Sequence, residues 1–349
     1  MWRDRRDDTE VTGYRPPLPA SGALLAWPTE FGQRFTIFVD TEEEFDWTQP
    51  LSREARSVSA IAALPEAAAR FAAGGAPLTL LVDHPVATEA SAIDHIRRLL
   101  TDDPRHGVGT QLHPWVNPPF DEAVTPRNSF VGNLPEALHA AKLDVLTDAI
   151  TAAFGAPRVY RAGRYGIGPA TLRLLAERGY RFDSSVRARY DYSDEQGSDF
   201  SAHGNHPYIA PEGVIELPLT TVFTGWARRL GPMLHRLGGA VPKGHGLLSR
   251  SGALNRVALT PEDMPLAEAL EAVRIVAGEG LGLLHFSFHS PSLVAGHTPY
   301  VRDASDLAVF WAWWDAVLAL LDRLGIRAAS LDDLLAAADA SGAGGPGRT

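Results

Sequence analysis

The stretch Arg34–Glu42, RFTIFVDTE, is an apolar, β-rich run that ends in carboxylates. A segment with helical periodicity, residues 57–73, follows it and ends at Gly74-Gly75. Polar clusters end four other apolar runs in the same way: Val82-Asp83-His84, Leu112-His113-Pro114-Trp115, Arg161-Ala162-Gly163-Arg164-Tyr165 and Phe288-His289-Ser290. Catalytic groups collect at the carboxyl ends of strands in parallel α/β barrels. These positions therefore predict a barrel enzyme.

Strands and helices alternate along the rest of the chain. The predicted strands are 34–40, 77–83, 108–113, 159–163, 180–186, 214–219, 281–288 and 326–330. The predicted helices are 57–73, 89–100, 135–154, 169–178, 266–277, 304–324 and 331–338. This alternation indicates a mostly parallel sheet with helices outside it. The number of units favours an α/β barrel over an open sheet.

We expect one folded domain, residues 31–340, because barrels often reach this length as a single unit. Residues 1–30 are polar and proline-rich and predict a flexible N-terminal segment, while the glycine-rich residues 341–349 predict a disordered tail. Insertions near 114–134 and 218–265 interrupt the alternation. Insertions of this length are more often functional than idle, and the second is a candidate lid or partner surface.

The composition excludes several kinds of site and partner. The net charge of −10 and the lack of a basic cluster interleaved with aromatic residues argue against nucleic acid. The chain has no cysteine, so a metal would be held by His, Asp, Glu, Asn or water. No signal peptide follows the charged N-terminus, and no uninterrupted apolar stretch of about 18 residues occurs. We expect a cytoplasmic protein with no membrane span, and leave open whether it forms a homo-oligomer.

The acidic run that begins at Asp40 holds five carboxylates in seven positions. Such a run is often a solvated turn. Here it follows a buried strand, and residues two apart on an extended chain point to the same side, so Asp40 and Glu42 can address one site. Like charges this close need a cation or a shared proton between them. Asp83, after the next strand, either caps the following helix or faces the same site.

Basic and aromatic residues end the other strands. His113 is either a hydrogen-bonded structural residue or a ligand. Arg161 and Arg164 can each hold Asp40 ionised, bind an anionic substrate group or form a surface salt bridge. His289 is nearer the carboxyl end of its strand than His285, which gives it the better position for acid-base chemistry.

Four strings in this order resemble the polysaccharide deacetylases of the NodB-homology type, carbohydrate esterase family 4. They are DTEEEFDW (40–47), LHPWVNPP (112–119), RAGRYG (161–166) and FHSPSL (288–293), and they look closest to the branch called WalW-like. The resemblance covers roughly residues 34–335. It implies an irregular (β/α)7-type barrel, the glycoside hydrolase/deacetylase fold.

The resemblance also implies roles for individual residues. Asp40 matches the catalytic base, Arg161 the arginine that orients it, and His289 the acid that protonates the leaving nitrogen. Glu42 and His113 match metal ligands, whereas Asn117 stands where the family has a second metal-binding histidine. Asp83 is a candidate to complete the shell, and the cofactor implied is a divalent metal, zinc first. Asp183 is a candidate for the fourth motif. Trp47, Trp115, Arg164 and Tyr165 are candidates for substrate binding, or for packing alone.

The function implied is hydrolysis of an N-acyl amide, most simply an N-acetyl group on an amino sugar or glycan precursor. Two alternatives remain. One is a ureide or cyclic-amide hydrolase on the same barrel, for which the departure at Asn117 and a metal-independent site would be natural. The other is a non-catalytic glycan-binding homologue. The expected partner is a carbohydrate or a small N-acyl substrate; a cytoplasmic enzyme would meet a nucleotide-linked sugar, a lipid-linked precursor or a small metabolite.

Overall fold

The computed structural model describes residues 13–239 and 244–343. Its strands are β1 (Arg34–Thr41), β2 (Leu78–Val82), β3 (Gly107–Leu112), β4 (Val159–Ala162), β5 (Phe182–Asp183), β6 (Tyr208–Ile209), β7 (Ile215–Glu216), β8 (Thr221–Thr224), β9 (Asn255–Ala258), β10 (Leu283–His289) and β11 (Arg327–Ala328). Its α-helices are α1 (Leu64–Ala73), α2 (His84–Thr88), α3 (Ala90–Asp102), α4 (Glu136–Phe154), α5 (Thr171–Glu177), α6 (Gly231–Gly239), α7 (Gly244–Arg250), α8 (Leu266–Gly278), α9 (Ala304–Arg323) and α10 (Leu331–Ala340).

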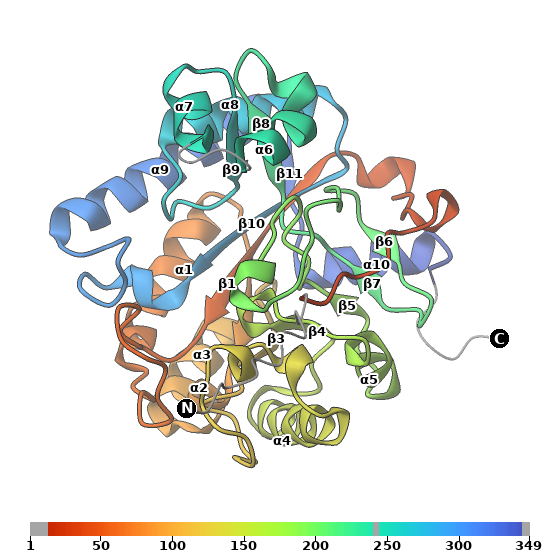
Figure 1. The fold of residues 1–349 in the computed structure, drawn as a ribbon. Helices are drawn as coiled ribbons and strands as arrows, with labels where there is room; N and C mark the ends of the chain where they lie inside the picture. The colour runs from red at the N-terminus through yellow and green to blue at the C-terminus, as the bar shows by residue number, and fades with distance from the viewer. Residues whose placement is uncertain (1–12, 240–243, 344–349) are drawn as a thin grey trace, which may run out of the picture.

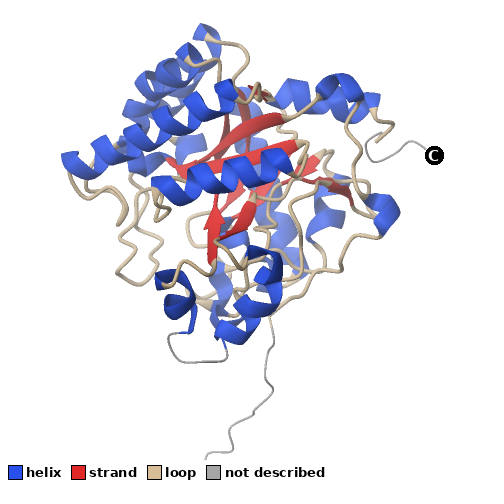
Figure 2. Ribbon diagram, turned by 90° about the horizontal axis from the view of Figure 1, so that it is seen from above, coloured by secondary structure: helices blue, strands red, loops and turns tan. Residues whose placement is uncertain are grey.

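The main sheet is curled and largely parallel, with helices around it (Figures 1 and 2). Its strand order is β10-β1-β2-β3-β4-β5-β7-β6, β11 pairs with β1, and β6 alone runs antiparallel to its neighbour. In the described residues no strand ladder joins the β7 side to β10. Single hydrogen bonds span this gap instead: Thr220 N donates to His285 O at 3.3 Å, and Ser287 N to Leu259 O at 3.2 Å. The predicted irregular α/β barrel is confirmed.

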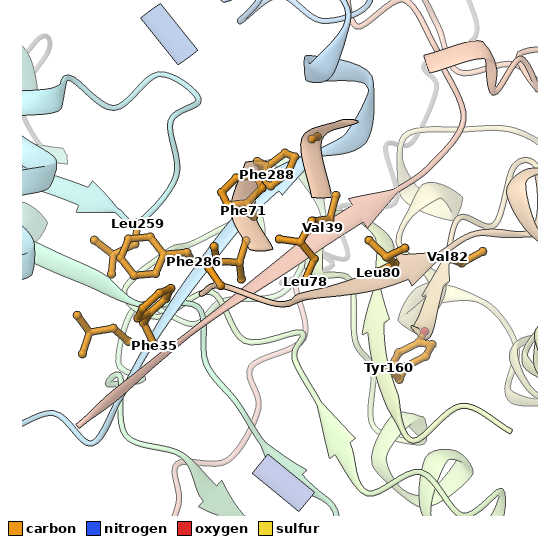
Figure 3. Packing of buried hydrophobic residues seen from close by; sticks show 14 of the residues in the cluster. Phe35, Val39, Phe71, Leu78, Leu80, Val82, Tyr160, Leu259, Phe286 and Phe288 are labelled. Atoms are coloured by element: carbon orange, nitrogen blue, oxygen red, sulfur yellow. The ribbon is translucent and has the colours of Figure 1, made fainter. Parts of the chain in front are cut away.

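Alternation along each strand separates two apolar layers. On β1, Phe35, Ile37 and Val39 point outward and pack under the helices. Figure 3 shows this layer, in which Phe71 of α1 stacks on Phe288 of β10 with ring centroids 5.8 Å apart. Inward-facing residues nearer the amino ends of the strands form a second cluster, which includes Phe38, Leu81, Val159, Phe182 and Leu283 and is closed from below by α10. The barrel interior is therefore a packed core except at its carboxyl end.

The same alternation makes the inward positions at the carboxyl end polar. Asp40 follows Phe38 on the inward side of β1, Arg161 follows Val159 on β4, and His289 lies three inward positions beyond Leu283 on β10. The register of β1 and β10 sets Asp40 directly opposite His289, and that of β3 and β4 sets Gln111 opposite Arg161. A polar site at this end therefore follows from the alternation of side chains along the strands alone.

The N-terminal segment packs against later parts of the chain, and the insertion near 218–265 helps to span the gap beside β10. Residues 1–12 and 344–349 of the predicted flexible ends lie outside the described residues; within 13–30, Leu25 N donates to Pro207 O at 2.8 Å and Arg15 pairs with Asp199. The insertion near 218–265 contains the antiparallel β8–β9 pair and the short helices α6 and α7, which Figure 1 shows together at one edge of the molecule. The division into domains stays a prediction.

Helix α9 is long and apolar enough to cross a membrane by length and composition, with a mean hydropathy of 1.4. Its Phe310, Trp313 and Trp314 are buried in the main core, and its N-terminus is capped by Asp303, whose side chain accepts from two backbone N–H groups. Packing on the barrel accounts for its apolar face. The expectation of no membrane span stays a prediction.

Candidate functional site

A cavity of about 480 Å³ opens at the carboxyl ends of the strands, within the size range of small-ligand sites. It is lined by polar strand-end residues and by a ring of aromatic side chains: Asp40, Glu42, Gln111, His113, Arg161, Arg164, Arg187, Glu195 and His289, with Phe45, Trp47, Trp115, Tyr165, Tyr192 and Tyr300. Of the residues proposed from the sequence, the cavity walls include all except Asp83, Asn117 and Asp183.

Asp40 is held by a buried arginine. Arg161 Nη1 donates to Asp40 Oδ1 and, at 3.0 Å, to Ser287 Oγ. The rest of the guanidinium is fixed by Ser184, whose carbonyl accepts from Nε at 3.0 Å and whose Oγ accepts from Nη2 at 2.9 Å. Both side chains are almost fully buried, and a buried charge is tolerated when it is paired and hydrogen-bonded. Oxygen Oδ1 is thereby occupied, which leaves Oδ2 of Asp40 toward the cavity.

His289 faces Asp40 and is held from behind by Glu262. Nε2 of His289 lies 3.7 Å from Asp40 Oδ2, and Nδ1 lies 2.7 Å from Glu262 Oε2. Glu262 also accepts from the backbone N–H of His289 at 3.1 Å and from Ser292 Oγ at 2.6 Å. Burial disfavours the imidazolium, but the negative charges of Glu262, Glu42 and Asp40 outweigh it and raise the pKa of His289 to about 10. At neutral pH His289 is therefore a charged proton donor.

A second group of acids lies behind the cavity wall. Glu43, Asp83 and His113 are buried, with one ligand atom of each within 4.8 Å of the others. His113 Nδ1 lies 2.8 Å from Glu43 Oε2, and Asp83 Oδ2 accepts from the backbone N–H of Glu43 at 2.8 Å. Burial raises the pKa of Glu43 to about 7, and the pKa of Asp83 well above its usual range. Two carboxyls and an imidazole, buried with too little positive charge, are a donor set that fits a divalent cation.

Glu42 connects this group to the cavity. Its Oε2 accepts from Gln111 Nε2 at 3.1 Å and lies 3.6 Å from His113 Nε2. Burial raises the pKa of Glu42 to about 8, against the opposing effect of the nearby histidines. His113 therefore has one nitrogen toward Glu43 and the other toward Glu42, so its imidazole lies between Glu43 and the acid that lines the cavity.

Aromatic side chains form the cavity walls. Trp115 is buried, stacks on His113 with centroids 4.3 Å apart and donates Nε1 to Glu43 Oε1 at 2.8 Å. Trp47 is 38% exposed and lies edge-on to His289 at 5.3 Å. Tyr165 stacks on Tyr192 at 5.8 Å. Trp115 thus supports the acids as well as the wall, whereas Trp47 stands at the rim.

Arg164 is engaged by other residues of the protein. It forms an ion pair with Glu195, and Ser129 Oγ accepts from its Nη1 at 2.5 Å. Its guanidinium lies over the ring of Phe130, 4.3 Å from the centroid. Arg164 lines the cavity, but its charge is compensated.

Asn117 points to a different part of the fold. Its Nδ2 donates to the carbonyls of Pro118 at 2.7 Å and Lys142 at 2.9 Å, so the side chain secures the loop after β3. Asp83 caps α2 by accepting from Val86 N at 2.9 Å, and it also belongs to the buried acid group, although it does not line the cavity. His285 lies deep, with Nδ1 3.1 Å from Leu217 O.

Sequence reasoning missed Glu43 and Glu262. The side chain paired with His289 is Glu262 and not Asp183, which is hydrogen-bonded to Ser185 and shares a buried acidic pair with Glu216. Glu43 lies in the acidic run, but strand alternation assigns it to the side opposite Asp40 and Glu42. The sequence therefore does not predict it as a site residue. No signal in the sequence of the 218–265 insertion separates Glu262 from other acids.

No protein-family model and no curated protein matches the chain. Among solved structures, a provisionally named polysaccharide deacetylase from Mycobacterium smegmatis superposes with a TM-score of 0.55 at 17% identity, covering 95% of this chain and 98% of that one. A provisionally named glycoside hydrolase/deacetylase from Parabacteroides distasonis superposes with a TM-score of 0.51 at 12% identity, covering 88% of this chain and 70% of that one. At these identities the likeness shows the fold: the chain is an α/β protein with the glycoside hydrolase/deacetylase barrel.

Proposed function

We propose that the protein hydrolyses an N-acyl amide, most simply the N-acetyl group of an amino sugar or glycan precursor. One observation carries the proposal: Asp40, fixed by Arg161, and His289, fixed by Glu262, face each other across 3.7 Å at the floor of one cavity. Amide hydrolysis needs a base for water and an acid for the leaving nitrogen, and a carboxyl and an imidazole next to each other can take these two roles.

The protein's own residues supply both proton transfers. Asp40 Oδ2 is free to take a proton from the attacking water, because Arg161 occupies Oδ1 and holds the carboxylate in place. His289 Nε2 then donates a proton to the departing amine, which is an easy step for a group that is protonated at neutral pH. Glu262 holds the imidazole ring by Nδ1, so that Nε2 points to Asp40 and the cavity.

Glu43, Asp83 and His113 would hold a divalent cation, with Glu42 next to them on the cavity side. Bound there, such an ion supplies Lewis-acid polarisation of a carbonyl and acidifies water. His113 and Glu42 connect the buried acids to the place where the reacting atoms would lie, because both residues also line the cavity. We propose zinc as one candidate ion, since imidazole and carboxylate are both ligands that zinc accepts.

Trp47, Tyr165 and Trp115 would bind the apolar faces of a sugar ring, as aromatic cavity walls do. The proposed place of the chain in the WalW-like branch rests on the four strings of strand-end residues and on the fold that surrounds them.

The test is release of acetate from N-acetylglucosamine and its oligomers, with a cyclic ureide in parallel. We expect Asp40→Asn to lower kcat by at least about 100-fold, the usual size of a general-base contribution. Asp46→Asn, at an exposed position of the same acidic run, is the matched control and should match the wild type. Full activity in Asp40→Asn would refute the assignment of the base, and cleavage of the ureide alone would favour the cyclic-amide alternative.

A further inference from the structure

The cavity contains three arginines, and two of them are paired with carboxylates. Arg161 pairs with Asp40 and Arg164 with Glu195. In the described part of the chain no carboxylate lies within ion-pair distance of the third, Arg187, although it lines both this cavity and a smaller adjoining one of about 220 Å³. An arginine beside a reaction site that lacks an acidic partner needs an explanation, because a guanidinium keeps its charge under all ordinary conditions.

Arg187 is held by tyrosines in place of carboxylates. Its guanidinium carbon lies 4.0 Å from the ring centroid of Tyr190 and 5.5 Å from that of Tyr165. Tyr192 Oη accepts from Nη1 at 3.2 Å, and Nε is buried with no hydrogen-bond partner. Aromatic faces position a guanidinium without neutralising it. The side chain is therefore oriented and partly desolvated. It keeps its full positive charge and still has N–H donors that can bind a ligand.

The segment that lines the smaller cavity beside Arg187 is basic in composition. Residues 217–261 include six Lys and Arg and no Asp or Glu, in a chain whose net charge is −10. Leu219, Ala258, Leu259 and Thr260 of this segment line the smaller cavity next to Arg187. Two acids also line that cavity: Glu262, which is already bound to His289, and Asp263.

We infer that Arg187 binds an anionic group of the substrate, so that the substrate class is an N-acylated amino sugar bearing a phosphate or a carboxylate. This inference rests on the proposed function for the amide, but the anion subsite itself does not need turnover. Phosphate and carboxylate share the chemistry that a guanidinium recognises: two oxygens that accept parallel N–H bonds. The residues that bind the anion are separate from Asp40 and His289, so Arg187 determines specificity and takes no part in proton transfer.

The test measures binding of three de-N-acetylated sugars, which cannot be turned over: glucosamine, glucosamine 1-phosphate and muramic acid. Isothermal titration calorimetry should show at least one of the two anionic ligands binding about 10- to 100-fold more tightly than glucosamine, as expected for a charge-assisted bidentate contact. Preference for glucosamine 1-phosphate identifies a phosphate substrate, and preference for muramic acid a carboxylate. Arg187→Met should abolish the difference between the anionic ligands and glucosamine, while Arg187→Lys should keep part of it.

A control variant separates ligand binding from support of the tyrosines. Arg256 lies on the other flank of Tyr190, 3.7 Å from its centroid, and does not line either cavity. Arg256→Met removes a stacked guanidinium from the same tyrosine, so it should keep the anion preference. The inference is overturned if the wild type binds neither anion more tightly than glucosamine, if Arg187→Met keeps the preference, or if Arg256→Met loses it equally. If deacetylation fails while the anion preference holds, the proposed reaction is wrong and the subsite stands.

Discussion

Glu262 controls the charge of the proposed acid. One carboxylate oxygen of Glu262 accepts from the backbone N–H of His289 and from Ser292, and the other lies beside Nδ1 of His289. A glutamine there can keep the first oxygen and the side-chain shape, but it removes the charge and the acceptor beside Nδ1. We expect Glu262→Gln to lower the pKa of His289 from about 10 by at least one unit, because it removes the largest stabiliser of the imidazolium. The imidazolium would then be lost at lower pH, and the alkaline limb of the kcat/KM profile would move down. NMR titration of His289 measures the shift directly.

Glu54→Gln controls for the general loss of one negative charge. Glu54 is exposed, and its contacts do not include His289. An unchanged His289 titration in Glu262→Gln, or an equal shift in both variants, would contradict the role of Glu262 as a positioning residue.

Strand phase explains which site residues could be predicted. Asp40, Arg161 and His289 follow apolar strands directly, so their sequence positions determine the side of the sheet on which they lie. Glu43 comes after β1 has ended, where alternation no longer applies, and its side chain turns to His113, just after β3. Glu262 comes from an insertion that has no period to extrapolate.

At the scale of elements, the close approach of β3 and β4 decides where His113 stands. A Cβ on Gly163, just after β4, would lie 2.2 Å from His113 Cδ2 and 2.6 Å from the backbone oxygen of Leu112. We expect Gly163→Ala to destabilise the fold by about 1–3 kcal/mol through overpacking and to displace the imidazole. Urea unfolding measures the first effect and the affinity for a divalent cation the second.

Gly278→Ala in α8 is the matched control, because a Cβ there meets nothing within 4 Å. It should be neutral or slightly stabilising, as expected for alanine in place of glycine in a helix. Unchanged stability and unchanged cation affinity in Gly163→Ala would show that the β3–β4 contact does not hold His113.

The elements of the barrel were predictable because their apolar residues repeat with a helical or strand period. Predicted helices 135–154 and 304–324 match α4 and α9 to within one residue at each end, and the strand predicted at 34–40 matches β1. The structure shortens the predicted strand 180–186 to β5, since its later residues bend away to place Ser184 and Ser185 beside Arg161 and Asp183. The β8–β9 pair and α6–α7 have no such period, and tertiary contacts with α8 and with one another define them.

For the whole molecule, the buried acids predict an unusual dependence of stability on pH. Burial raises the pKa of Glu42 to about 8, and carboxylate neighbours raise that of His289 to about 10 against burial. Between pH 7 and 9 the folded protein therefore binds more protons than the unfolded chain, whose carboxyls are ionised and whose histidines are neutral. Stability must then fall as pH rises, by about 1.4 kcal/mol per pH unit for each extra proton held.

A divalent cation should oppose this dependence, because it takes the place of protons on the buried carboxyls of Glu43 and Asp83 and binds more tightly as they leave. In EDTA we expect the free energy of unfolding, measured in urea, to fall between pH 7 and 9. Added Mg²⁺, Mn²⁺ or Zn²⁺ should restore stability, and more so at pH 9 than at pH 7. Asp83→Asn, which keeps the shape of the helix cap but removes a charged ligand, should weaken the cation's effect. A free energy that is flat or rising with pH in EDTA would show that the buried carboxyls are already compensated by the protein itself, and the case for a resident cation would fail with it.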